Sequence, residues 1–195
     1  MTRTNIRTAR ATVAQGALAK SVLPFAVPIL LTFGLLLLVG DRWPRDVAPG
    51  SGLKLAGFFA TVITACAVWH HAVGRVEDRK ARQFVALVCA LTGLMGWPVW
   101  SVGVLPSING SVQRNHHTVR MTLERTEVTH ASKSRNLYHW AWLRADGGTH
   151  ARLSGRYFIT GALYESLGNA SSAQVDVTFA EGLLGAQTVL GFDRR

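Results

Sequence analysis

Three long apolar stretches fill most of the first half of the chain. They cover residues 21–40, 54–73 and 84–105, and Lys54 is the single charged residue within them. A bilayer core of about 30 Å needs roughly 20 helical residues for each crossing, and every stretch is close to that length. The pattern therefore predicts a transmembrane region over residues 21–106 that consists of three helices.

The second half, residues 107–195, alternates apolar and polar residues over short segments. A period of two predicts a half-buried strand, whereas a spacing of three or four predicts a helix. The expected strands cover residues 117–124, 137–144, 149–153, 173–179 and 186–192, and the expected helix covers 157–167. This order predicts a small α+β domain, in which a helix covers one face of an antiparallel sheet.

The charge pattern predicts how the helices are oriented. Lys and Arg outnumber Asp and Glu by 21 to 11, but they are spread along the chain, so we expect no nucleic-acid binding. Residues 1–20 have no acid, and segment 74–83 is also basic; such segments tend to stay in the cytoplasm. We therefore predict a cytoplasmic N-terminal segment and, after three crossings, a periplasmic domain. The sequence contains no eukaryotic sorting signal, which favours a bacterial inner membrane.

Two cysteines and a histidine in the predicted crossings have metal-binding chemistry. Cys66 and His70 are four residues apart on the second helix, and Cys89 lies in the third. Thiolate and imidazole groups bind zinc, copper and haem iron. These residues are the candidates for a metal site, but no ligand motif repeats. We therefore expect packing roles for them, and no metal or cofactor.

The predicted crossings also limit the function. They contain no Asp or Glu, and proton-coupled transporters usually need an ionisable group inside the membrane. Small residues, either Gly93 and Gly96 or Gly57 and Ala60, are suited to close helix packing, so a homo-oligomer is possible. The lipid bilayer itself is the first expected partner.

An aromatic row marks the second predicted strand. Tyr138, Trp140 and Trp142 repeat at a period of two, which places all three on one side of the strand. Aromatic residues are enriched where proteins bind one another. We predict that this row, with the polar segment 126–136, binds a partner. The alternative is that the row packs beneath the helix or against a loop close to the membrane.

Enzyme signatures are absent from the sequence. It has no Gly-x-Ser-x-Gly turn, no His-Glu-x-x-His motif and no Gly-rich phosphate loop. We therefore predict a non-enzymatic membrane protein whose periplasmic domain binds a protein partner or assembles a membrane complex. Two alternatives remain: a membrane immunity protein against a bacterial toxin, and a metal- or haem-binding redox component of the membrane.

Overall fold

The structure is a computed structural model. It describes residues 16–39, 46–73, 76–130, 137–168 and 173–194. The chain divides into two compact units: the described residues up to 39 with Leu53–Leu105 form the first, and residues 46–52 with 106–194 form the second. The second unit is thus assembled from two separate segments of the chain.

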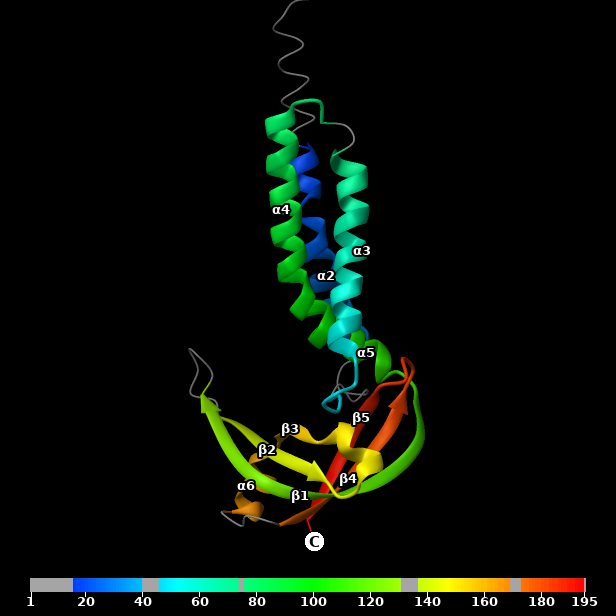
Figure 1. Ribbon diagram of the computed structural model, residues 1–195, viewed down its shortest axis with the longest axis vertical. Coiled ribbons are helices and arrows are strands. Elements are labelled where there is room, and N and C mark those ends of the chain that lie inside the picture. The colour runs from blue at the N-terminus through cyan, green and yellow to red at the C-terminus, as the bar shows by residue number, and fades with distance from the viewer. Residues whose placement is uncertain (1–15, 40–45, 74–75, 131–136, 169–172, 195) are drawn as a thin grey trace, which may run out of the picture. The chain divides into compact units, whose positions relative to one another are not determined.

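The first unit is a bundle of three apolar helices that run alongside one another (Figure 1). They are α2 (Leu23–Val39), α3 (Leu53–Val73) and α4 (Arg79–Pro98), and α4 continues into the π-helix η1 (Val99–Val104) and the helix α5 (Leu105–Asn109). Two stretches, Leu53–His71 and Arg79–Asn109, are long and apolar enough to cross a membrane, while the apolar part of α2, Leu23–Leu38, is shorter. A helical N-terminal region with two membrane-length segments is therefore present.

The third helix begins before its apolar stretch. The sequence predicts a start near residue 84, but α4 starts at Arg79 because Asp78 caps it. The Asp78 carboxylate accepts a hydrogen bond of 2.8 Å from the backbone N–H of Lys80. Such a cap satisfies an amide that has no partner within the helix, so polar residues can form the first turn.

Small residues bring the helices of the bundle together. A Cβ atom at Gly96 would lie 2.6 Å from the carbonyl oxygen of Pro24, and one at Gly57 would overlap the Ser101 side chain. The hydroxyl of Thr92 also donates a hydrogen bond of 2.6 Å to the carbonyl of Ser21. These glycines therefore serve packing within one chain, and the homo-oligomer stays a prediction.

The second unit is built on a five-stranded antiparallel sheet with the order β3-β2-β1-β4-β5 (Figure 1). Its strands are β1 (Gln113–His130), β2 (Leu137–Ala145), β3 (Gly155–Ile159), β4 (Gln174–Gly182) and β5 (Gln187–Arg194). β1 is the central strand and bends along its length, with register shifts near Arg114 and Leu123. The predicted antiparallel sheet is confirmed.

Two expected elements of the sheet domain were wrong in position. Residues 149–153 are not a strand but belong to a 3-10 helix, η2 (Gly148–Leu153). The strand β3 instead occupies the start of the expected helix 157–167, since pairing with β2 overrides the helical spacing. The helix α6 (Gly161–Leu167) begins only after Thr160, whose hydroxyl accepts a hydrogen bond from the N–H of Leu163.

The first strand is longer than its alternation predicts. The sequence predicts a strand over 117–124 and a polar loop over 126–136, but residues 126–130 belong to β1 and pair with β2. Residues 131–136 lie outside the described part of the chain. Cross-strand partners, which the local pattern does not show, decide where this strand ends.

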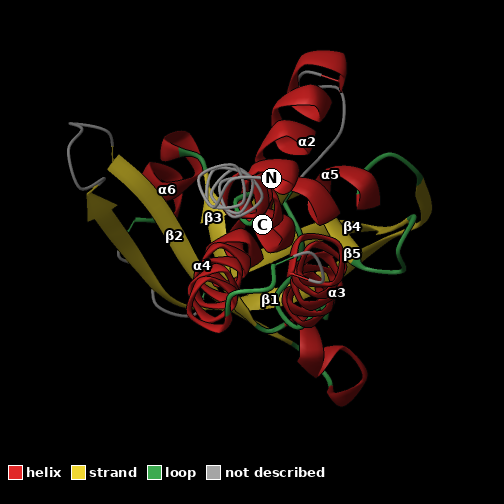
Figure 2. Cartoon of the chain, turned by 90° about the horizontal axis from the view of Figure 1, so that it is seen from above, coloured by secondary structure: helices red, strands yellow, loops and turns green. Residues whose placement is uncertain are grey.

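The core of the domain lies on one face of the sheet. Met121 and Phe179 are fully buried there, and α6, which lies beside β2 (Figure 2), adds the buried Leu167 to the same cluster. The helix therefore packs against the core face through Leu167.

The segment between α2 and α3 completes this domain. The backbone N–H of Ala48 donates to the carbonyl of Gln187, the N–H of Val189 donates to the carbonyl of Asp46, and both hydrogen bonds are 2.8 Å long. Val47 lies opposite Thr188 in this pairing. The first residues of the outer edge of β5, Gln187–Val189, are thereby paired with a segment that precedes α3 in the chain.

Asn109 joins the end of α5 to the turn between β4 and β5. Its side chain is fully buried and donates to the carbonyl of Ala186 (3.0 Å) and to the hydroxyl of Thr188 (2.9 Å). Its amide oxygen accepts from the N–H groups of Leu184 (3.0 Å) and Ala186 (3.3 Å). The amide group thus satisfies four polar partners in the interior.

Replacing Asn109 should destabilise the sheet domain strongly. Asn109→Ala leaves buried donors and acceptors without partners, at a cost of about 3 kcal/mol in the free energy of unfolding. Denaturant unfolding of the full chain in detergent, followed by tryptophan fluorescence, measures this loss. Ser111→Ala is the matched control, because it removes one partly buried hydroxyl that bonds Ile108 and should cost below about 1 kcal/mol. Equal losses in the two variants would contradict the role of Asn109.

Tyr157 is a buried ionisable group in the same core. Its side chain is 3% exposed, its hydroxyl donates to the carbonyl of Leu153, and its ring contacts Phe179. Burial disfavours the charged phenolate and raises the pKa of Tyr157 above its ordinary value. The unfolded chain therefore loses this proton at a lower pH than the folded domain.

Alkaline pH should weaken the fold through Tyr157. Its contribution is fully present below the unfolded pKa of about 10 and is lost as the pH rises further, by about 1.4 kcal/mol per pH unit. Denaturant unfolding curves, measured at several pH values above about 10, give the free energy of unfolding at each pH. This free energy should fall less steeply with pH for Tyr157→Phe than for the parent chain. Identical slopes in the two proteins would show that the hydroxyl does not titrate with unfolding.

Candidate functional site

Trp140 and Trp142 project from the sheet on the side opposite the core. They alternate along β2 with Ala141 and Leu143, which are buried in the core cluster that includes Leu167 of α6. Successive side chains of a strand point to opposite faces. The aromatic row therefore does not pack beneath α6, and it lies on the outer face of the sheet.

The two tryptophans belong to a set of side chains that spans three strands, which we call the aromatic face. β2 contributes the aromatic row, β3 contributes an arginine and a phenylalanine, and β1 contributes polar partners. The aromatic face consists of Arg125, Glu127, Thr129, Tyr138, Trp140, Trp142, Arg156 and Phe158.

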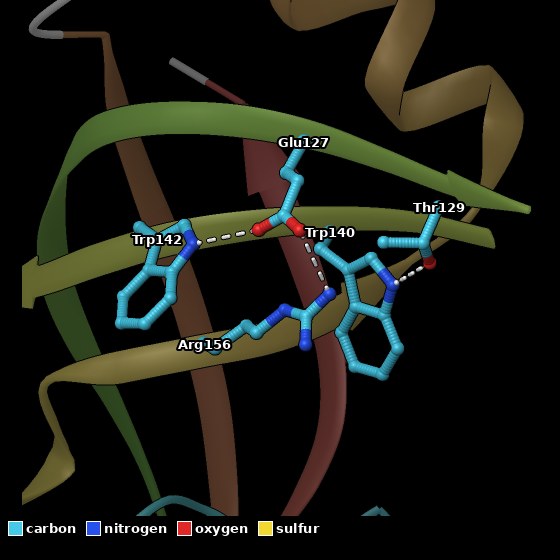
Figure 3. A network of polar contacts seen from close by, with 5 residues as sticks. All are labelled: Glu127, Thr129, Trp140, Trp142 and Arg156. Carbon is cyan, nitrogen blue, oxygen red and sulfur yellow. Dashed lines mark hydrogen bonds and ion pairs between the residues drawn. The ribbon is translucent and has the colours of Figure 1, made fainter.

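Hydrogen bonds fix both indole rings (Figure 3). Trp140 donates from Nε1 to the hydroxyl of Thr129 at 2.8 Å, and Trp142 donates from Nε1 to the carboxylate of Glu127 at 3.3 Å. The other oxygen of Glu127 accepts from the guanidinium of Arg156, also at 3.3 Å. The polar atom of each indole is therefore satisfied within the chain.

Two arginines lie over the indole rings. The guanidinium carbon of Arg156 is 4.0 Å from the ring centre of Trp140, and that of Arg125 is 4.6 Å from the ring centre of Trp142. These distances are within the range of cation–π attraction, which is worth about 0.5–1 kcal/mol at exposed sites. Phe158 adds an edge-to-face contact with Trp140 at 5.5 Å. The rings are held from several sides.

Apolar surface remains exposed at one end of this arrangement. Phe158 is 43% exposed and Tyr138 is 41% exposed, while both tryptophans are half-buried. Neighbouring charges on the same sheet face form ion pairs, Arg120 with Asp176 at 3.7 Å and Arg144 with Glu124 at 3.6 Å. The face therefore offers ordered aromatic groups, and its two arginines and one glutamate give it a formal charge of +1.

The metal candidates do not assemble a site. Cys89 is buried and lies 3.4 Å from the carbonyl oxygen of Ala65, whereas Cys66 and His70 are exposed on α3. Cys66 lines an apolar groove of about 230 Å³, and the other lining residues are Phe58, Thr61, Val62, Ala65, Ala90, Gly93, Leu94 and Trp97. Across the described ranges, no group of three or more His, Cys, Asp or Glu side chains could hold a metal ion.

Sequence reasoning located the aromatic row but missed its partners. Both Phe158 and Arg156 lie on β3, but the pattern placed Phe158 in the expected helix 157–167 and assigned Arg156 to no element, and Glu127 fell in the polar segment 126–136. The weak signal was Arg156-Tyr157-Phe158-Ile159, in which buried and outward side chains alternate. Assigning these partners requires the strand register, which pairs Trp140 with both Glu127 and Phe158.

The contact between Glu127 and Arg156 should add little to stability. Both side chains are more than a third exposed, so solvent screens the ion pair and we expect a coupling energy of about 0.5 kcal/mol. A double-mutant cycle with Glu127→Gln and Arg156→Gln, measured by denaturant unfolding, gives this value. It should shrink as salt is added. A coupling energy several times larger would mean that the aromatic face is a structural core and not a surface.

Comparison with protein-family models, curated proteins and solved structures finds no match for this chain.

Proposed function

We propose that this chain is a non-enzymatic integral protein of a bacterial inner membrane, and that its periplasmic domain binds a protein partner through the aromatic face. Three helices cross the membrane in this proposal, and the N-terminal segment is cytoplasmic. The observation that carries the proposal is the set of exposed, ordered aromatic side chains on the outer face of the sheet.

The division of the chain supports the membrane arrangement. Residues 46–52 and 106–194 fold into one unit, so the stretch that contains α3 and α4 leaves this unit and returns to it. Two membrane-length helices that start and finish on one side must cross as a pair. The apolar part of α2 is roughly 24 Å long by helical rise, and residues 16–20 before it are also helical.

Positive charge supports the orientation. Residues 1–20 contain Arg and Lys without any acid, and α4 begins with Arg79, Lys80 and Arg82. Residues 1–20 lead into α2, and Arg79, Lys80 and Arg82 form the start of α4. In both cases the chain reaches the sheet domain only after it has passed through the helix. The tendency of such residues to remain in the cytoplasm leaves the sheet domain in the periplasm.

The composition and rigidity of the aromatic face support partner binding. Trp, Tyr and Arg are the residues that most often carry the binding energy of an interface. Hydrogen bonds and cation–π contacts already hold Trp140 and Trp142, so little side-chain freedom remains to be lost on binding. A toxin captured as the partner would identify the chain as an immunity protein.

Chemistry at the aromatic face favours binding over catalysis. Among its eight residues there is no cysteine, serine or histidine, and its single acid, Glu127, is engaged by Arg156 and Trp142. Its hydroxyl groups belong to Thr129 and Tyr138, and this surface has no histidine and no uncommitted carboxylate to serve either as a base. A metal-dependent redox role lacks a ligand set, since no group of three or more His, Cys, Asp or Glu side chains that could hold a metal ion occurs among the described residues.

Capture from native membranes tests the proposed interface. The tagged full chain should retain a specific protein partner through purification in mild detergent, and Trp140→Ala with Trp142→Ala should abolish this retention. Thr118→Ala with Thr178→Ala is the matched control, because these residues lie on the same sheet face outside the aromatic face. The control pair should retain the partner fully.

Circular dichroism and an unfolding curve must accompany the capture. The proposal predicts that the tryptophan variant keeps its secondary structure, since Trp140 and Trp142 lie outside the core cluster. Loss of the fold in this variant, or undiminished retention of the partner by a folded variant, would overturn the assignment of the interface.

A further inference from the structure

The turn between β4 and β5 exposes two adjacent leucines. Leu183 is 51% exposed and Leu184 is 46% exposed, at a tip formed by Glu181, Gly182 and Gly185. Turns usually consist of small and polar residues, and single exposed leucines need no explanation. Two neighbouring leucines at the tip of one short turn form a compact apolar projection instead.

The shape of this turn is fixed by Asn109. Leu183 donates its N–H to the backbone carbonyl of Asn109 at 2.9 Å, and Leu184 donates to the Asn109 side chain at 3.0 Å. Gly182 allows this approach, because a Cβ atom there would overlap Asn109. The leucines are therefore held in place by backbone hydrogen bonds while their side chains remain exposed.

The residue that holds the turn is also the last residue of a membrane-length segment. The apolar helical stretch Arg79–Asn109 ends at Asn109. If this stretch crosses the bilayer, Asn109 lies where the chain leaves the membrane, and a side chain next to it lies at the same level. Leu183 is hydrogen-bonded to the backbone of Asn109. With the helix crossing the bilayer, Leu183 therefore lies at the boundary between lipid and water.

We infer that the Leu183-Leu184 turn inserts into the lipid surface beside the end of the membrane helix. This inference rests on the proposed membrane function. Apolar side chains at this level transfer from water into the region where headgroups meet acyl chains, which removes their exposed area from water. Arg114, exposed on β1 and paired in register with Glu181, lies next to the turn and is suited to contact anionic headgroups.

Spin labels on the full chain test the insertion. The label is attached to Leu183→Cys in a background of Cys66→Ala and Cys89→Ala, and the protein is reconstituted into vesicles of phosphatidylethanolamine and phosphatidylglycerol. Oxygen concentrates in lipid, and a nickel chelate stays in water, so relaxation by the two reagents reports the environment. Two reference positions are Leu91→Cys on α4 and Gln174→Cys at the opposite end of β4.

The expected result is that Leu183 resembles Leu91, with oxygen relaxing the label more than nickel does, while Gln174 shows the reverse. Leu184→Cys should agree with Leu183 and guards against a misfolded variant. A Leu183 label that reports water while the Leu91 label reports lipid would overturn this inference but leave the membrane proposal intact. A label shielded from both reagents would overturn it in favour of a protein contact. If Leu91 also reports water, the membrane proposal fails with it.

Discussion

The hydrogen bonds between residues 46–48 and β5 constrain the whole chain. They pair a segment that precedes α3 with a strand that lies far beyond α4, so the sheet domain is complete only when the helical stretch between them returns to its starting side. A soluble helical hairpin would satisfy this closure too. The two helical stretches are long and apolar enough to cross a membrane, with Lys54 at the start of one and basic residues at the start of the other, and this composition is what a crossing pair requires.

The aromatic face illustrates how weak contacts can order a surface without burying it. Each interaction there is worth about 1 kcal/mol or less by its type, which is small beside the burial of Met121 or Phe179 in the core. Together they fix the orientation of two half-buried indole rings. Such preorganised side chains favour binding, because ordering long side chains at the moment of binding costs free energy.

Local pattern predicted the apolar helices, four of the five strands and the aromatic row. It failed where a contact distant in sequence decides the structure. β3 is a strand because Phe158 and Tyr157 pair with Trp140 and Ala141, and its spacing alone resembles the helix that follows. The local sequence around Asn109 does not show that its side chain is buried, since its four hydrogen-bond partners lie more than 70 positions away. The pairing of residues 46–48 with β5 is likewise unmarked in the local pattern, because its partners lie far along the chain.

The strand β1 separates the two surfaces that the domain offers. Its first residues, Gln113 and Arg114, pair with the end of β4 beside the leucine turn, whereas Glu127 and Thr129 near its other end support the tryptophans. The intervening residues correspond to roughly 40 Å along an extended strand, although β1 is bent. The leucine turn and the aromatic face therefore lie toward opposite ends of one strand. A lipid surface at the turn and a protein at the aromatic face would contact different parts of the same sheet, so the two proposals do not compete for the same residues.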